Sequence, residues 1–265
     1  MPRKYNSIAG VILTAIANVL FTAFLIQIPG QTAAAVNDFD FVAAADFGCT
    51  SNTSKTITNM AGKNPEIAFA MGDLSYTSTP DCWFKETASL DSIMKIAIGN
   101  EDVTNTTLLN QYLDHYAPHE RYYSFDYQNV HFTIFDTDLG YRGTDSTQVA
   151  WVKDDLSNAD ANPNITWKVV IFHRASAFTS YSTLVRDTFN PIFDQHGVDL
   201  VMFGHNHNYE RGFPMKYNSQ SPSNPIVTDT DPNTYSDPEG VIYVKIGTGG
   251  HSLNGCDLHD RQPGD

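Results

Sequence analysis

The chain contains a series of short apolar runs, and this series constrains its fold more than any other feature of the sequence. The runs are continuous, whereas a strand with one face in water would alternate apolar and polar residues. Each run therefore predicts a strand that is covered on both faces. The runs occupy residues 39–45, 67–71, 96–98, 130–135, 168–172, 199–203 and 241–246.

Segments with helical spacing lie between several of these runs. Alternation of strands and helices is typical of α/β folds, in which helices cover parallel or mixed sheets. The stretch 219–240 is rich in Ser, Pro, Asn and Asp and is interpreted as a surface loop. The expected helices span residues 51–61, 81–93, 106–116, 148–159 and 182–196.

The first residues have the order of an export signal. Arg3 and Lys4 precede an apolar stretch over residues 7–28, and a Pro-Gly pair and three consecutive alanines follow it. A stretch of about 22 residues is also long enough, at ~1.5 Å per residue, to cross a bilayer. We therefore predict a signal peptide or membrane anchor over residues 1–35. The remainder, 36–265, would be one exported domain, secreted or attached at the outer face of the membrane.

The chain is strongly acidic. It carries 16 Lys and Arg against 30 Asp and Glu, a formal net charge of −14. Nucleic-acid binding relies on a basic face that releases counterions, so a nucleic-acid partner is not expected. A small phosphate ester stays compatible with this charge, because bound metal ions reverse the local sign of the field. Three cysteines are too few for a disulfide framework, although one bridge between Cys49 and Cys82 would suit an oxidising compartment.

Polar residues directly follow several of the apolar runs. In open α/β sheets ligands bind outside the carboxyl ends of the strands, so these residues are expected at one rim. His205 and His207 are the sharpest signal, because side chains two apart at a strand end share one face. Two carboxylates, a phenol, an amide and three imidazoles are suitable donors for a pair of metal ions. The candidate metal ligands are Asp46, Asp73, Tyr76, Asn100, His173, His205 and His207.

The ordered motifs resemble those of the calcineurin-like metallophosphoesterases, and among them the purple acid phosphatases. That family has D-x-G, G-D-x-x-Y, G-N-H-[DE], V-x-x-H and G-H-x-H in this order. Tyr76 discriminates within the superfamily, because most calcineurin-like relatives lack a tyrosine ligand. The matching segments are Asp46-Phe47-Gly48, Gly72-Asp73-Leu74-Ser75-Tyr76, Gly99-Asn100-Glu101, Val170-Ile171-Phe172-His173 and Gly204-His205-Asn206-His207.

The resemblance implies a two-sheet β-sandwich flanked by helices, with two metal ions at the strand ends. One ion is typically ferric iron and the other zinc, ferrous iron or manganese, and Asp73 would bridge them. A metal-bound hydroxide would attack the phosphate ester. The resemblance assigns the other ligands as Asp46, Tyr76 and His207 at the ferric site, and Asn100, His173 and His205 at the second site.

The chain departs from the family pattern after Asn100, where Glu101 replaces a histidine that helps to bind phosphate or to protonate the leaving group. Glu101 is either a general acid with a raised pKa, which would favour acid pH, or a solvated loop carboxylate. The triplet 100–102 can also be aligned with the histidine deleted. A second histidine, common in the family after the V-x-x-H motif, is absent near Tyr181 and Ser182.

These residues predict an exported dinuclear-metal phosphatase that acts on phosphate monoesters with an optimum at acid pH. A phosphodiesterase, pyrophosphatase or nucleotidase on the same centre is one alternative. A non-catalytic metal or phosphate binder at the cell surface is another, and the missing histidine supports it. His251 follows two glycines after the last run; it either faces the site or is a loop residue, and the sequence favours the loop residue. The polar tail 257–265 is consistent with a shortened C-terminus.

Overall fold

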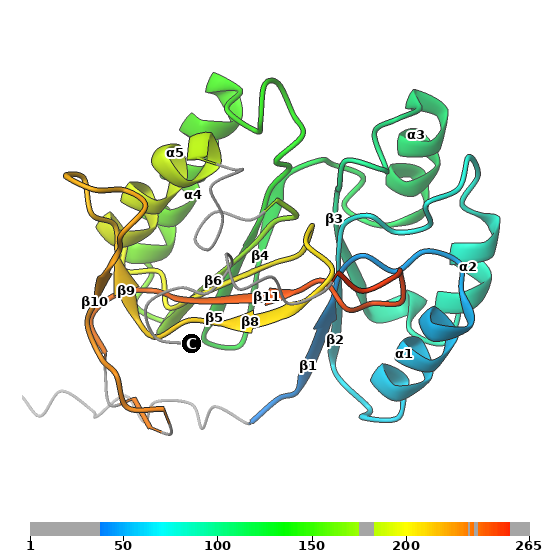
Figure 1. The fold of residues 1–265 in the computed structure, drawn as a ribbon, viewed down its shortest axis with the longest axis horizontal. Helices are drawn as coiled ribbons and strands as arrows, with labels where there is room; N and C mark the ends of the chain where they lie inside the picture. The colour runs from blue at the N-terminus through cyan, green and yellow to red at the C-terminus, as the bar shows by residue number, and fades with distance from the viewer. Residues whose placement is uncertain (1–37, 175–182, 233, 236–237, 255–265) are drawn as a thin grey trace, which may run out of the picture. The chain divides into compact units, whose positions relative to one another are not determined.

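The computed structural model describes residues 38–174, 183–232, 234–235 and 238–254 (Figure 1). The chain divides into two units, Met1–Ala35 and Val36–Asp265, and all described residues belong to the second. The predicted signal or anchor segment and the polar tail lie outside the described residues, as do Tyr181 and Ser182. Within the described part, no helix combines the length and apolar character needed to cross a membrane.

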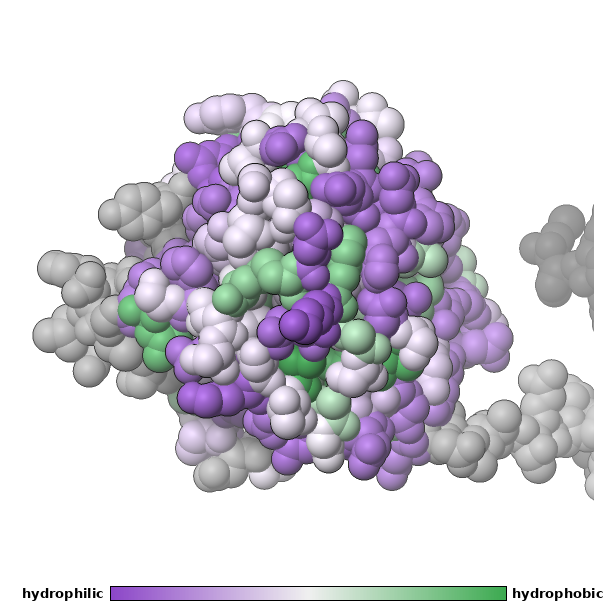
Figure 2. Space-filling model, turned by 90° about the vertical axis from the view of Figure 1, so that its right-hand side faces the viewer, coloured by the Kyte–Doolittle hydropathy of each residue, from purple (hydrophilic) through white to green (hydrophobic). Residues whose placement is uncertain are grey.

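The first sheet has three parallel strands in the order β1-β2-β3. All five residues of β2 are buried, as its unbroken apolar sequence predicts. Three helices lie on one side of this sheet, and the surface over them is mostly hydrophilic with smaller hydrophobic patches (Figures 1 and 2). The elements are β1 (Phe41–Ala44), β2 (Ile67–Met71), β3 (Met94–Ala97), α1 (Ser51–Ala61), α2 (Asp81–Thr87) and α3 (Thr106–His115).

The second sheet has six strands in the order β4-β5-β6-β7-β11-β8. Strands β5, β6, β7 and β11 run parallel, and β4 and β8 pair antiparallel at the two edges. Two helices cover one face of this sheet (Figure 1). The elements are β4 (Tyr123–Tyr127), β5 (Val130–Ile134), β6 (Trp167–Ile171), β7 (Leu200–Phe203), β8 (Tyr209–Arg211), β11 (Ile242–Ile246), α4 (Ser146–Ala161) and α5 (Thr183–Gln195), with a ribbon of β9 (Met215–Lys216) and β10 (Ile226–Val227).

The two sheets share an apolar layer, in which Phe69 of β2 packs against Phe132 of β5 with their ring centroids 5.2 Å apart. Two further apolar clusters fill the space under the helices, one beneath α1, α2 and α3 and the other beneath α4 and α5. The layers therefore form a two-sheet sandwich flanked by helices, which confirms the predicted fold class.

Three local predictions need correction. The helix expected over 81–93 ends at Thr87, and a short 3₁₀ turn (Asp91–Ile93) precedes β3. The N–H of Leu90 donates to the carbonyl of Thr87, a tight turn that buries Leu90 in the core. Strands β4, β8 and β9 were absent from the apolar runs, because β4 is a half-buried edge strand and β8 and β9 have only three and two residues. Strand β10 lies within the stretch interpreted as a loop.

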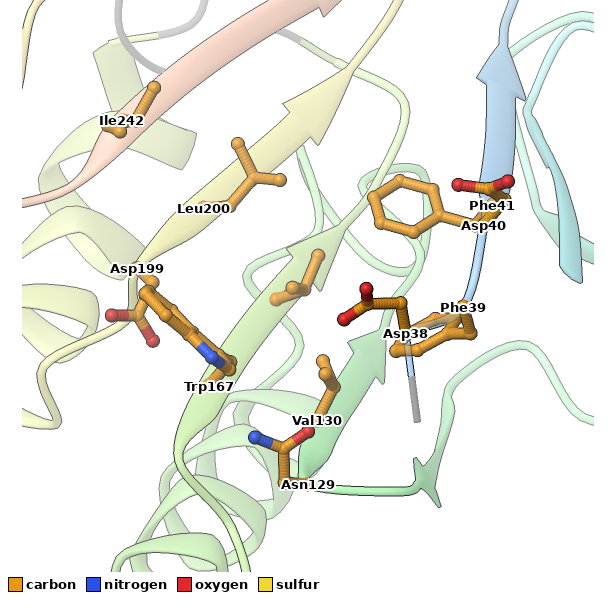
Figure 3. Close-up of a pocket in the computed structure, with 11 residues that line it drawn as sticks. Asp38, Phe39, Asp40, Phe41, Asn129, Val130, Trp167, Asp199, Leu200 and Ile242 are labelled. Carbon is orange, nitrogen blue, oxygen red and sulfur yellow. The ribbon is translucent and has the colours of Figure 1, made fainter. Parts of the chain in front are cut away.

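A groove with a volume of about 760 Å³ lies at the amino ends of the strands (Figure 3). Phe39 and Phe41 line it from the first sheet, and Val130, Leu200 and Ile242 line it from the second. The candidate ligands follow the carboxyl ends of their strands, so this groove and the candidate site occupy opposite ends of the sandwich.

A partly buried polar cluster joins α4 to the second sheet. The two ring nitrogens of His131 lie 2.6 Å from Asp126 Oδ1 and 3.0 Å from Asp155 Oδ2. Ser124 and Thr133 also donate hydrogen bonds to the carboxylate of Asp155. Burial would lower the pKa of His131, but the hydrogen bonds and charges of Asp155 and Asp126 raise it above its ordinary value. The folded state therefore favours the imidazolium form.

This cluster should make the domain more stable at mildly acid than at alkaline pH. Because the folded pKa of His131 is raised, its contribution is complete below about pH 6.5 and is lost as the pH rises through the folded value. We expect His131→Gln to lower the free energy of unfolding by about 1–3 kcal/mol at pH 6, with a smaller difference at pH 9. Denaturant unfolding at both pH values measures this difference in the free energy of unfolding. The variant His119→Gln, at an exposed residue, serves as control. A pH-independent difference would contradict it.

Candidate metal centre

The backbone at the strand ends is held in an unusual conformation. Asp46, Asp73, Tyr76 and His205 all have positive φ values, of 61°, 52°, 55° and 74°. Non-glycine residues seldom adopt this region, because it strains the backbone, and residues strained in this way cluster at functional sites. Four of the eight non-glycine residues with positive φ in the described part of the chain are thus predicted ligands, which supports this rim as a candidate site.

Two glycines allow the ligand loops to approach one another closely. A methyl group added at Gly99 would collide with the backbone nitrogen and the carboxylate of Asp73. At Gly204 an added methyl group would collide with Ala45 and lie 2.6 Å from Asp46 Oδ2. The glycine at the start of these two motifs is thus required by the packing of the loops.

The predicted ferric-site residues converge around the hydroxyl group of Tyr76. This oxygen lies 3.1 Å from Asp46 Oδ1, 3.1 Å from Asp73 Oδ2 and 3.0 Å from His207 Nε2. Burial and the charges of the two carboxylates raise the pKa of Tyr76 far above its ordinary value. A phenolate at this position therefore needs a compensating cation.

The predicted second-site residues lie beside this group. His173 Nε2 is 3.2 Å from Asp73 Oδ2, and ligand atoms of Asp73, His173 and His205 all lie within 4.8 Å of one another. The backbone N–H of His205 donates to Asp46 Oδ2 at 2.9 Å. Asn100 is held near this group by its neighbour Glu101, because the backbone N–H of Glu101 donates to Asp73 Oδ1 at 2.8 Å. The structure thus brings all the predicted ligands to one rim.

Several lone pairs in this group are left for a metal ion. The Nδ1–H of His173 donates to the carbonyl of Met71 at 2.9 Å, so its buried Nε2, 3.2 Å from Asp73 Oδ2, is the nitrogen that faces the site. Asn100 Oδ1 is buried without a partner among the described residues. His207 Nδ1 donates to the carbonyl of Ser252 at 2.7 Å, which directs Nε2 toward Asp46. Imidazoles oriented by a backbone carbonyl are typical metal ligands, so these residues fit a metal centre.

Buried charges shift the pKa values of the imidazoles strongly. Burial would lower the pKa of His173, but the carboxylates of Asp73 and Asp46 raise it to about 10. Burial and the positive charges of His173 and Arg174 lower the pKa of His205 to about 3. Coordination needs neutral imidazoles, so metal binding would displace the proton that His173 holds.

Asp102, which sequence reasoning did not single out as a site residue, joins the second and third ligand loops. Its buried carboxylate accepts hydrogen bonds from the N–H groups of Asp73, Leu74 and Gly99 at 2.9, 2.9 and 2.8 Å. It follows Gly99 at the spacing of the acidic residue in G-N-H-[DE]. Glu101 therefore occupies the histidine position, and the alternative alignment with a deleted histidine is unnecessary.

Glu101 contacts the amide of its neighbour. Its Oε1 accepts a hydrogen bond from Asn100 Nδ2 at 2.8 Å. This contact turns the amide so that Asn100 Oδ1 is the atom without a partner. The carboxyl group is thus adjacent to a predicted ligand, and its role as a general acid stays a prediction.

His251 also belongs to the site, although the sequence favoured a loop role for it. Its ring stacks on Tyr76 with the ring centroids 4.0 Å apart, and its Nδ1 lies 3.2 Å from His207 Nδ1. The backbone N–H of His251 donates to the carbonyl of Asp46 at 2.9 Å. The only sequence signal was the Gly249-Gly250 pair, which lets the chain pass close to the end of β1.

Cys49 and Cys82 form a disulfide with their Cα atoms 6.0 Å apart. Cys49 follows the first ligand loop, and Cys82 lies in the first turn of α2, after the second. The bridge that the sequence left open is therefore present, and it links the segments that carry Asp46 and Tyr76.

Comparison with known families agrees with this geometry. Residues 35–209 match the model of the calcineurin-like phosphoesterase family. The chain belongs to this family. Its relatives include purple acid phosphatases, as the tyrosine-containing motif G-D-x-x-Y indicated.

Purple acid phosphatase 23 of Arabidopsis thaliana is 28% identical over 253 residues, covering 78% of this chain and 51% of the relative. The uncharacterized protein Rv2577 of Mycobacterium tuberculosis is 34% identical over 119 residues, covering 43% of this chain and 22% of the relative. The purple acid phosphatase PPD1 from yellow lupin seeds shares the fold, with a TM-score of 0.64 and 23% identity, covering 80% of this chain and 44% of that one. The chain thus spans about half the length, or less, of these relatives.

Proposed function

We propose that this protein is a dinuclear-metal phosphatase that hydrolyses phosphate monoesters, with an optimum at acid pH. The observation that carries the proposal is the convergence of two carboxylates, a phenol and three imidazoles on one rim, with buried lone pairs left unpaired. Bound metal ions would lower the pKa of a water molecule, supply the nucleophile and neutralise charge on the phosphoryl oxygens. The family and its purple acid phosphatase relatives support this reaction class.

The donor set supports a ferric ion beside a divalent ion. The phenolate of Tyr76 suits ferric iron, whereas the neutral amide of Asn100 and the imidazoles suit zinc, ferrous iron or manganese. Such a pair carries about +5, and ionised Asp46, Asp73 and Tyr76 would leave about +2. That local charge would hold a phosphate dianion on a chain whose net charge is −14.

Export is part of the proposal. The predicted signal or anchor over residues 1–35 would carry the domain out of the cytoplasm. The disulfide between Cys49 and Cys82 supports this placement, because disulfides persist in oxidising compartments. We propose a small phosphate ester as the partner and no nucleic acid.

The function can be tested on the full chain loaded with iron and zinc. We expect two bound metal ions, a purple tyrosinate-to-iron absorption and hydrolysis of an aryl phosphate monoester between about pH 4 and 8. Faster cleavage of a diester would favour the phosphodiesterase alternative. Bound metals without turnover would favour the non-catalytic binder, for which Glu101 in the histidine position is the supporting observation.

Glu101→Gln tests the proposed general acid. Glutamine keeps an acceptor for Asn100 Nδ2 but cannot donate a proton, so we expect kcat to fall about 10²-fold and the alkaline limb of its pH profile to flatten. Metal content should stay unchanged, because the amide of Asn100 remains oriented. Glu120→Gln, an exposed-residue variant outside the site, serves as control. An unaltered kcat and pH profile would leave Glu101 as a positioning residue for Asn100 only.

A further inference from the structure

The side chain of Arg174 lies against the candidate metal centre. Arg174 follows His173 in sequence, and its Nη1 is 3.1 Å from Nε2 of His205. A guanidinium group has donors but no acceptor, so Nη1 donates to the imidazole lone pair. That lone pair cannot coordinate a cation at the same time. A metal ion on His205 Nε2 would displace Nη1 from this position, and the N–H of Arg174 would then lie beside the ion without an acceptor.

The opposite edge of the guanidinium group is fixed. Arg174 Nε and Nη2 donate to Asp138 Oδ1 at 2.9 and 2.8 Å, and the backbone N–H of Arg174 donates to Thr137 Oγ1 at 3.0 Å. The N–H of Asp138 in turn donates to the buried carboxylate of Asp136 at 2.6 Å. Only 14% of the Arg174 side chain is exposed. These bonds would keep the guanidinium group beside the centre when Nη1 leaves His205, so that its free edge could bind an anion.

The site needs such a donor. Glu101 stands where the family has a phosphate-binding histidine, and a carboxyl group there, neutral or ionised, brings no positive charge to a bound anion. Among the residues described, Arg174 is the one Lys or Arg that hydrogen-bonds to a predicted metal ligand. A second arginine, Arg142, comes from the same loop as Asp138, and its positive charge also acts on His205. The cationic groups thus gather on the His205 side of the centre.

We propose that Arg174 is a catalytic residue that binds the substrate phosphoryl group, in place of the missing histidine. With metal ions bound, Nη1 donates to a non-bridging phosphoryl oxygen and stabilises the charge there during transfer. The guanidinium group favours a dianion over a monoanion, so the site selects phosphate monoesters over diesters. This inference rests on the proposed function, and Asp138 is its positioning residue.

The test uses the metal-loaded full chain and its Arg174→Gln, Arg174→Lys and Arg211→Gln variants. Arg211 is exposed on β8 and donates to the carbonyl of Pro232, so its variant removes the same charge away from the site. Titration calorimetry with orthophosphate and metal analysis are the readouts besides turnover. We expect unchanged metal content in all variants and at least about tenfold weaker orthophosphate binding in Arg174→Gln. Arg174→Lys should retain part of the affinity, and Arg211→Gln all of it.

Turnover should also depend on Arg174, and more strongly for a monoester than for a diester. Arg174→Gln is expected to lower kcat/KM for an aryl monoester about 10²-fold and to change diester cleavage much less. Orthophosphate binding equal to the wild type would overturn the proposal. Loss of metal ions in Arg174→Gln would overturn it too, because Arg174 would then support His205 instead. If the wild type binds metal and orthophosphate without turnover, the proposed phosphatase function is wrong. The role of Arg174 in binding phosphate is then judged only by the orthophosphate affinities of the variants.

Discussion

Asp73→Asn is expected to abolish both metal loading and hydrolysis. The carboxylate of Asp73 lies between Tyr76 and His173, with Oδ2 3.1 Å from the Tyr76 hydroxyl and 3.2 Å from His173 Nε2. Asparagine keeps the shape but removes the negative charge that two cations would share. We expect turnover to fall at least about a thousandfold, a loss of about 4 kcal/mol in transition-state stabilisation.

Metal analysis and hydrolysis of an aryl phosphate measure this effect. Asp114→Asn is a matched control, because Asp114 is exposed on α3 away from the site. His207→Ala should remove the proposed ferric ion and its colour, since His207 faces Asp46 and Tyr76. Full metal content and activity in both Asp73→Asn and His207→Ala would eliminate the proposed centre.

Asp102→Ala is expected to have the largest effect on stability. The change removes the acceptor of three backbone N–H groups at buried positions, those of Asp73, Leu74 and Gly99. Each unsatisfied buried donor costs about 1–3 kcal/mol, and partial relaxation would leave a net loss of about 3–5 kcal/mol in the free energy of unfolding. The loops that carry Asp73 and Asn100 would separate, so metal affinity should fall as well.

Denaturant unfolding of the metal-free protein measures this loss without interference from the ions. Asp102→Asn keeps one acceptor oxygen and should be intermediate between the wild type and Asp102→Ala, which allows a comparison even if the alanine variant does not fold. Equal stability of all three proteins would show that these hydrogen bonds add nothing net to folding.

The sequence predicted the elements whose pattern is local. Helix α1 begins at Ser51 and ends at Ala61 as expected, and β2 matches its apolar run to the residue. Strand β4 has no continuous run because it is half-buried at a sheet edge, but its residues alternate aromatic and polar, a period-two signal that a search for continuous runs misses. Helix α2 ends early because Leu90 turns into the core, which depends on packing partners elsewhere in the chain.

The candidate ligands could be predicted because each directly follows a strand, and parallel strands bring their carboxyl ends together. The residues around them could not be found this way. His251 reaches Tyr76 across a wide gap in sequence, and Arg174 meets Asp138 and His205 only after β5, β6 and β7 have paired. Their roles depend on tertiary contacts, for which a single sequence holds no periodic pattern.

The bond between Cys49 and Cys82 makes the metal centre sensitive to the chemistry of its surroundings. It joins positions 33 residues apart, on either side of the segment that supplies Asp73 and Tyr76. A reductant would release this tether while leaving every candidate ligand chemically intact. Protein made in a reducing cytosol would therefore hold metal ions at the proposed centre more weakly than protein folded under oxidising conditions, so the choice of expression host would itself alter the apparent stoichiometry of bound metal.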